Sequence, residues 1–234
     1  MKNNFTKRTS LIIGEDGIEK LHNAKVLVVG VGGVRSFAVE ALARAGLGNI
    51  TIVDYAVVEI EDFNRQLPGL TSNLEEDKVK VVGERLLDIN PELNIRTFKC
   101  VFNEDTSKEI FNDNFDFVID VIDMVSSKIH LIEECKKRNI KIISSMGMGN
   151  KLDPTKIEID DIYNTSVCPL AKVMRKELRN RNIKELKVVY SKEKPIEVKE
   201  KISNGHRILP GSTSFLSPCG GMIIASFVIR ELIK

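Results

Sequence analysis

The 234-residue sequence contains no tryptophan, three tyrosines and four cysteines, and no two cysteines form a CxxC pair. The cysteines are far apart in the sequence, which argues against a structural zinc site and against a disulfide framework. No apolar run approaches the roughly 20 residues that a membrane span needs, and the polar residues 1–17 do not resemble a signal peptide. The net charge of +2 is too small to indicate nucleic-acid binding by itself. We therefore expect a cytoplasmic globular protein with no membrane association.

The most informative stretch is residues 25–55, which consists of an apolar strand, a glycine-rich turn, a helix and a second apolar strand. Glycines let the backbone approach a phosphate closely, and a helix N-terminus offers free N–H groups to an anion. An acidic residue about twenty positions later accepts hydrogen bonds from ribose hydroxyls. The residues that this pattern assigns to a nucleotide are Gly30, Gly32, Gly33 and Asp54.

One residue departs from the glycine pattern. The third glycine of the usual fingerprint falls at position 35, where this chain has Arg35. Its guanidinium either points at a phosphate or blocks the site, and the sequence leaves both readings open.

Further polar residues follow the second and fourth predicted strands. Asn64, Arg65 and Gln66 lie in an irregular loop, and Lys78 lies near the start of a helix predicted over residues 73–89. Because loops at the carboxyl edge of an open α/β sheet handle ligands, these side chains are candidates for a phosphate site.

The strand predicted over residues 115–122 contains Asp120, and Asp123 follows its end. A carboxylate at that edge suits metal or phosphate chemistry. Alternatively, Asp123 is only the N-cap of the next helix.

The alternation of strands and helices predicts an α/β fold with a doubly wound, mostly parallel, Rossmann-like sheet. We expect one domain, in which residues 1–150 form the nucleotide-binding half. Residues 151–234 form a substrate-side elaboration, ending in a helix from about residue 219 that returns to cover the sheet. At the other end, residues 5–21 are expected to pack through an apolar stripe that includes Leu11 and Ile12.

Residues 170–201 contain eleven lysines or arginines against five glutamates. This local excess is either a solvated face or a contact surface for a polyanion such as RNA.

Several separated motifs resemble the ubiquitin-activating-enzyme-like adenylating superfamily, which includes the molybdopterin- and thiamine-biosynthesis adenylating enzymes. They are GVGGV at residues 30–34, Asp54, the Asn64-Arg65-Gln66 triplet, Lys78 and the DVID stretch at residues 120–123. The stretches RTSLIIGEDGIEKL, CPLAKVMRKELR and PGSTSFLSPCGGMIIASFVIREL look closely like one branch, the tRNA threonylcarbamoyladenosine dehydratases. The similarity runs essentially from end to end.

The resemblance implies an enzyme that uses ATP and Mg²⁺ to adenylate the carboxylate of threonylcarbamoyladenosine in tRNA, which then cyclises. It implies that Arg65, Lys78 and Asp123 are catalytic, with Asp123 also at the metal, and that Asp54 binds ribose. Asn64 and Gln66 would shape the phosphate pocket. Arg8, on its own an ordinary solvated charge, matches an arginine that reaches across a homodimer interface. Sulfur-transfer proteins are possible partners by the same resemblance.

The chain departs from the family pattern at three positions near the nucleotide: Arg35 replaces glycine, Ala56 replaces aspartate and Asp62 replaces asparagine. These changes leave open a relative with an impaired nucleotide site. A second alternative is an activator of a sulfur-carrier or ubiquitin-like protein C-terminus. A nicotinamide dehydrogenase would explain the glycine turn but not the other motifs. Cys168 and Cys219 are candidate thioester-forming residues by position, although the adenylation chemistry needs no thiol.

Overall fold

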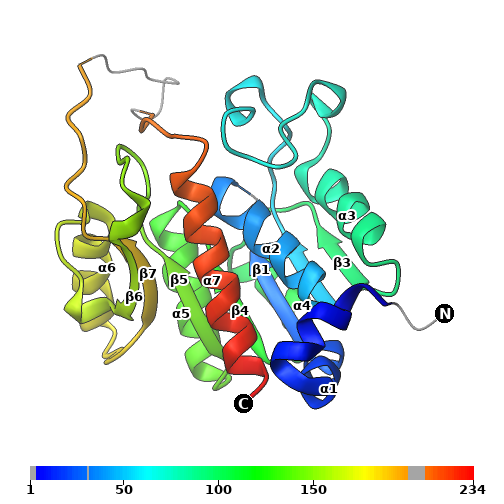
Figure 1. Ribbon diagram of the computed structural model, residues 1–234. Coiled ribbons are helices and arrows are strands. Elements are labelled where there is room, and N and C mark those ends of the chain that lie inside the picture. Colours follow the sequence, from blue (N-terminus) through cyan, green and yellow to red (C-terminus); the bar gives the residue numbers. More distant parts are fainter. Residues whose placement is uncertain (1–3, 31, 200–208) are drawn as a thin grey trace.

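A computed structural model describes residues 4–30, 32–199 and 209–234. Within these residues a seven-stranded sheet has the order β3-β2-β1-β4-β5-β7-β6 and carries helices on both faces (Figure 1). Neighbouring strands pair in parallel, except that β6 runs antiparallel to β7. Because the chain moves outward from β1 in both directions, the predicted doubly wound α/β fold is confirmed.

The strands are β1 (Lys25–Val29), β2 (Asn49–Val53), β3 (Asn94–Phe98), β4 (Phe117–Asp120), β5 (Lys141–Ser145), β6 (Ile157–Asp161) and β7 (Lys187–Ser191). The helices are α1 (Lys7–Asn23), α2 (Gly33–Ala45), α3 (Lys78–Ile89), α4 (Glu104–Ile110), α5 (Val125–Lys137), α6 (Pro169–Asn180) and α7 (Leu216–Leu232).

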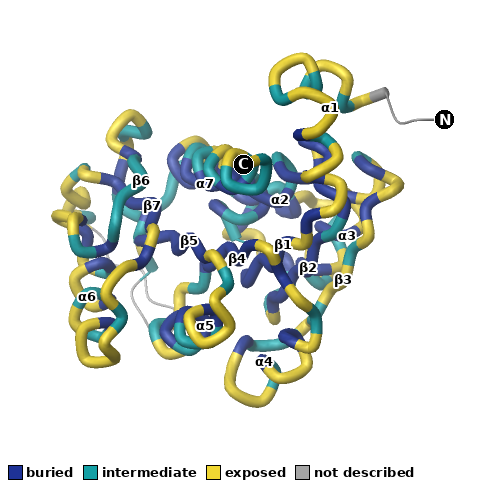
Figure 2. Tube along the Cα trace, turned by 90° about the horizontal axis from the view of Figure 1, so that it is seen from below, coloured by how far each residue is buried: buried dark blue, intermediate teal, exposed yellow. Residues whose placement is uncertain are grey.

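The sheet separates two apolar cores, and β1 contributes to both. Val26 and Val28 pack with residues of α2, α3 and α7. Leu27 and Val29 face the other way and pack with residues of α4, α5 and α6. Because both faces are covered, the central strands are continuous apolar runs, as parallel strands usually are. Figure 2 shows the buried central strands between the two helical layers.

The C-terminal helix covers the sheet beside α2, as expected (Figure 1). The two helices approach so closely at Gly221 that an added Cβ would lie 2.0 Å from the Val34 carbonyl oxygen. Helix α7 begins at Leu216 rather than near residue 219. Pro218 therefore lies in its first turn, where proline is tolerated because the backbone N–H has no intrahelical partner.

Two other predictions about helices were wrong. The helix expected from residue 73 begins at Lys78, because Glu75 has a left-handed φ of 68° and residues 75 and 76 pair with the backbone of Val58. The apolar stripe of α1 does not include Leu11 and Ile12, whose exposed fractions are 81% and 87%. Gly14, with φ 75° and ψ 170°, kinks α1 and breaks the helical periodicity between these residues and the buried part of the helix.

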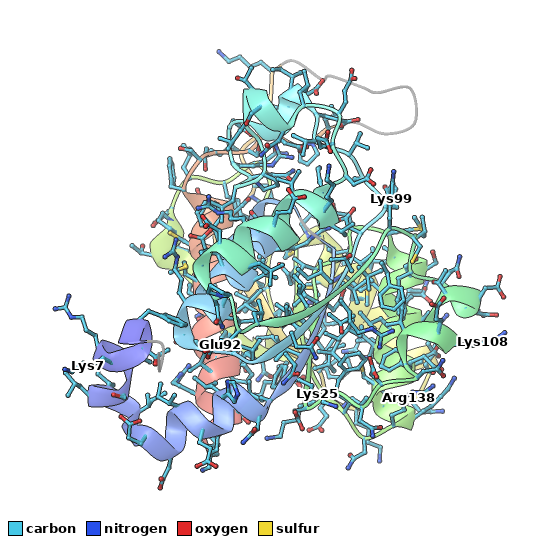
Figure 3. The ribbon with its side chains drawn as sticks, turned by 90° about the vertical axis from the view of Figure 1, so that its right-hand side faces the viewer. Lys7, Lys25, Glu92, Lys99, Lys108 and Arg138 are labelled. Atoms are coloured by element: carbon cyan, nitrogen blue, oxygen red, sulfur yellow. The ribbon has the colours of Figure 1, made fainter. Side chains whose placement is uncertain are left out.

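The carboxyl ends of the parallel strands share one edge of the sheet. In Figure 3, Lys25 marks the amino end of β1 and Lys99, just after β3, marks the carboxyl edge. The loop over residues 54–77 rises from this edge (Figure 1). None of the described helices is long and apolar enough to cross a membrane.

Candidate nucleotide site

The glycine turn connects β1 to α2 at the carboxyl edge of the sheet. Gly30 has a φ of 102°, a conformation that favours glycine, and its N–H donates to the Val53 carbonyl oxygen. Gly32 is the N-cap of α2, and the helix begins at Gly33. The turn therefore presents a helix N-terminus and three glycines, which together suit a phosphate.

Arg35 lies across this turn. A Cβ added to Gly30 would be 2.1 Å from Nη1 of Arg35 and 2.5 Å from its Cζ, so the guanidinium lies directly on the glycine. Nη1 is 3.2 Å from Oδ2 of Asp54, and Nη2 is 3.3 Å from Oδ2 of Asp123. Arg35 thus links the predicted ribose carboxylate with the predicted adenylate and metal carboxylate.

The two carboxylates differ in exposure. Asp54 is 6% exposed and accepts a 2.8 Å hydrogen bond from the Ala56 N–H. The Asp123 side chain is 70% exposed. Asp123 is not the N-cap of α5, since Met124 holds that position, so the capping alternative was wrong.

A second group of charges lies in the loop before α3, and Asp62 is at its centre. The Asp62 carboxylate is 2.7 Å from Nζ of Lys78 and accepts hydrogen bonds from the Glu59 N–H and from Nε2 of Gln66. Asp62, Lys78 and Gln66 are each less than 9% exposed. The Lys78 ammonium is therefore balanced by a residue that departs from the family pattern.

Gln66 has one further property. Its Oε1 is buried and accepts no hydrogen bond from the described part of the protein. A buried carbonyl oxygen without a donor costs about 1–3 kcal/mol, so a ligand or water that donates to it would be favoured.

Arg65 connects the two groups. Its Cγ would lie 3.2 Å from a Cβ at Gly33, so its stem crosses the start of α2. Nη1 donates to the Glu61 carbonyl oxygen and to Oδ1 of Asn64, and Nη2 is 3.9 Å from Asp62. Asn64 in turn donates to Ser212, just before α7.

The structure therefore brings together nine of the ten predicted site residues around the exits of β1, β2 and β4. They are Gly30, Gly32, Gly33, Asp54, Asn64, Arg65, Gln66, Lys78 and Asp123. Arg8 is not among them. It is exposed on α1, whose neighbouring Lys7 lies toward the amino end of the sheet in Figure 3.

Sequence reasoning missed several contacts in this region. Ser212 and Ser217, from the C-terminal part, touch Asn64 and the start of α2, and no motif indicated them. Arg35 and Asp62 were visible as departures from a pattern, but their partners were not.

Beneath the site, Asp120 forms a fully buried ion pair with Lys128 on α5. The Lys128 ammonium is 2.9 Å from Asp120, and it also donates to Oγ of Ser144 and to the Ser145 carbonyl oxygen. Since every proton of the ammonium has a partner, this pair fastens the end of β4 to β5 and α5 rather than facing a ligand.

The four cysteines are free, and none of the contacts described above for the site involves one. Burial raises the pKa of the Cys135 thiol and of the Cys100 thiol, which lowers their reactivity near neutral pH. Cys168 is also buried, and no cysteine of the described residues forms a disulfide.

The chain is similar to known proteins in both sequence and fold. Residues 6–234 match the ThiF family. The chain belongs to the ThiF family. The resemblance to the adenylating superfamily is thereby confirmed.

Among its ThiF-family relatives is the tRNA threonylcarbamoyladenosine dehydratase of Bacillus subtilis (strain 168). The two are 42% identical over 238 residues, covering 97% of this chain and 94% of that protein. The dehydratase of Escherichia coli (strain K12) is 36% identical over 172 residues, covering 74% and 64% of the two chains.

The fold is also similar to solved structures of such a dehydratase. The crystal structure of the E. coli dehydratase in complex with ATP has a TM-score of 0.90 and 28% sequence identity to this chain, covering 98% of this chain and 94% of that one. The complex of the same enzyme with AMP has a TM-score of 0.89, with 29% identity over 97% and 93% of the two chains. The E. coli enzyme thus binds both nucleotides.

Proposed function

We propose that this protein is an ATP-dependent tRNA threonylcarbamoyladenosine dehydratase. The observation that carries the proposal is the end-to-end similarity to the B. subtilis dehydratase, 42% identical over 97% of the chain. The site agrees with it, since a glycine turn, an acid after β2 and several cations meet at one edge of the sheet.

The proposed reaction has two steps. A carboxylate oxygen of threonylcarbamoyladenosine attacks the α-phosphorus of ATP, the bond to pyrophosphate breaks, and an acyl-adenylate forms. A nucleophilic atom of the carbamoyl group then attacks the activated carbonyl carbon and loses its proton, and the bond from that carbon to the AMP oxygen breaks. One carboxyl oxygen leaves with AMP, so the net change from the carboxylic acid form of the nucleoside is loss of water.

The residues of the site have distinct tasks in this proposal. Gly30, Gly32 and Gly33 let the phosphates approach α2, and Asp54 binds the ribose. Arg65 and Lys78 stabilise the charge that builds on the phosphate oxygens during attack. Asn64 and Gln66 shape the phosphate pocket.

Mg²⁺ is expected to arrive with the nucleotide. Among the residues that the structure describes, no group of three acidic, histidine or cysteine side chains could hold a metal by itself. Mg²⁺ is usually held by one or two carboxylates together with phosphates and water, and the exposed Asp123 fits that requirement. The ion would neutralise phosphate charge when bound.

The proposal extends to the partners. Leu11 and Ile12, on the kinked first part of α1, and Phe5, just before that helix, leave exposed apolar side chains that suit a homodimer interface carrying Arg8 to the neighbouring site. Residues 1–150 would then form the nucleotide half and residues 151–234 the substrate side. We place the enzyme in the cytoplasm, with no sulfur-transfer step of its own because the chemistry uses no thiol.

The test is ATP-dependent cyclisation of threonylcarbamoyladenosine in tRNA. We expect Arg65→Ala and Asp123→Ala each to lower kcat by about a hundredfold or more, because each removes a group aimed at developing or metal-borne charge. Arg85→Ala, which removes a cation paired with Glu40 away from the site, is the matched control and should keep full activity.

Normal turnover in both site variants would contradict the assigned roles. Pyrophosphate exchange that is stimulated by a carrier protein ending in Gly-Gly, and not by tRNA, would instead favour an activator of protein C-termini.

A further inference from the structure

Arg35 has no role in the reaction described so far, yet it occupies the centre of the site. Its guanidinium lies on Gly30, and its Cζ would be 3.5 Å from a Cβ at Gly32. It fills the space that these glycines keep open, in front of the N–H groups at the start of α2. This is the position at which the fold presents its positive helix end to an anion.

The contacts that hold Arg35 there are open to competition. Each carboxylate receives one guanidinium nitrogen, at 3.2 Å from Asp54 and 3.3 Å from Asp123, so neither contact is the paired fork in which arginine binds most strongly. The Asp123 contact is largely solvated, and exposed ion pairs contribute little. Asp54 is the stronger partner because it is buried, and it is also the group to which a ribose would bind.

The charges of the site balance before any ligand is counted. The acids Asp54, Asp62 and Asp123 face the cations Arg35, Arg65 and Lys78. Lys78 is neutralised by a buried aspartate at 2.7 Å, and Arg65 is tied to backbone and side-chain acceptors of its own loop. A triphosphate brings more negative charge than Arg65 and Lys78 can balance while they keep these partners, so a further cation that can change partners favours its binding. Arg35 already lies on the glycine turn.

The position of Arg35 in α2 makes such a change favourable. It lies in the first turn of the helix, where a positive charge is opposed by the helix dipole unless an anion is close. A phosphate at the turn satisfies the helix end and the guanidinium together. Rotation about side-chain bonds is sufficient, because the guanidinium is on the turn from the start.

We propose that Arg35 is an exchangeable phosphate ligand: when ATP binds, the ribose takes Asp54 and the Arg35 guanidinium passes from that carboxylate to the phosphates. Arg35 then sets how strongly the site prefers a triphosphate over a bare nucleoside. This inference rests on the proposed use of ATP, but it does not depend on the identity of the acyl substrate.

The experiment measures the affinity for ATP and for adenosine by calorimetry in the full-length protein, without tRNA. In Arg35→Gly we expect ATP affinity to fall about ten- to a hundredfold, the loss of a charge-assisted phosphate contact. Adenosine affinity should rise or stay level because the ribose no longer competes with Arg35 for Asp54. Arg35→Lys, which keeps the charge without the planar guanidinium, should give an intermediate ratio of the two affinities.

Arg44→Ala is the matched control, since Arg44 lies in the last turn of the same helix and pairs with Glu40. It should leave both affinities unchanged. Melting temperatures of all variants check that each is folded.

Equal gains for ATP and adenosine in Arg35→Gly would mean that Arg35 only blocks the site, and the proposal would be overturned. An unchanged ratio would overturn it as well, while leaving the proposed function intact. If the unaltered protein bound no ATP at all, the proposed function and this inference would both fail.

Discussion

At the scale of single residues, Asp62 stabilises the loop before α3. It gathers Lys78, Gln66 and the Glu59 N–H around one buried carboxylate. Breaking one side of a buried ion pair leaves the other charge unpaired, which is more costly than never having the pair.

We therefore expect Asp62→Asn to lower the free energy of unfolding by about 3 kcal/mol, since Lys78 loses its charge partner at a site that is nearly inaccessible to water. Urea denaturation measures this. Glu76→Gln is the control, because it breaks an ion pair with Lys80 in which both side chains are about half exposed, and its effect should be slight. Equal effects of the two substitutions would show that Asp62 does not stabilise the loop through Lys78.

The residue scale also shows what the sequence can and cannot predict about the site. Gly30, Gly32, Gly33 and Asp54 follow from the spacing of one strand–turn–helix unit, because that spacing is fixed by local geometry. The link from Arg35 to Asp54 and Asp123 spans 19 and 88 residues and depends on the strand order, so no local pattern contains it.

At the scale of secondary-structure elements, the packing of α7 on α2 rests on the absence of a side chain at Gly221. We expect Gly221→Ala to lower the free energy of unfolding by about 1–3 kcal/mol, because its Cβ would overlap the Val34 carbonyl oxygen and force the helices apart.

Gly83→Ala in α3 is the matched substitution. There an added Cβ meets Ile95 and Thr97 at an ordinary 3.5 Å, so the better helix propensity of alanine should raise stability by about 0.5–1 kcal/mol. Thermal unfolding of both variants measures the difference. Changes of the same sign and size would contradict the close approach of the two helices.

We expect helix α6 to contact tRNA. It buries Ala171, Met174 and Leu178 against the sheet layer. Its exposed Lys172 and Lys176 form no ion pair with any residue that the structure describes. The basic excess seen in the sequence is therefore partly unneutralised on the surface.

We expect the double substitution Lys172→Glu/Lys176→Glu to weaken tRNA binding roughly tenfold and to reduce its salt dependence, because phosphate contacts are lost. Filter binding at several salt concentrations measures both. Lys80→Glu/Lys108→Glu makes the same change of charge on α3 and α4 and should have a smaller effect. An equal loss in the two proteins would indicate only long-range repulsion.

The elements themselves were largely predictable, and the exceptions have physical causes. The strands are apolar runs buried on both faces, so their positions follow from composition. The prediction that α3 begins at residue 73 was wrong because residues 75–77 pair with the loop at Val57 and Val58 instead of continuing the helix. The prediction that Leu11 and Ile12 belong to the packed apolar stripe was wrong because a glycine with positive φ interrupts α1. Hydrophobic periodicity cannot reveal such an interruption.

At the scale of the whole molecule, the proposed site is incomplete without a second copy if Arg8 serves its neighbour. Arg8 lies on α1, away from the glycine turn of its own chain (Figure 1). We expect Arg8→Ala and Arg65→Ala each to be inactive alone. Mixing the two variants then distinguishes an Arg8 that acts on the neighbouring subunit from one that acts within its own chain. If Arg8 acts across the interface, a mixed dimer contains one site with both arginines intact.

We expect an equal mixture of the two variants, after subunit exchange, to recover about a quarter of the unaltered activity, since half of the dimers are mixed and one of their two sites works. Light scattering with size exclusion tests whether the protein is a dimer. No recovery despite demonstrated exchange would mean that Arg8 acts within its own chain. Full activity of Arg8→Ala on its own would mean that Arg8 has no role in turnover.

The position of α7 also has a consequence for biosynthesis. Helix α7 (residues 216–232) follows all seven strands in the sequence and completes the face of the sheet that α2 occupies. Until α7 is made, Val34, Ala38 and their neighbours lack its contacts, so the nascent chain exposes apolar surface. A stop codon that removes α7 would thus yield an aggregating product rather than a smaller working enzyme.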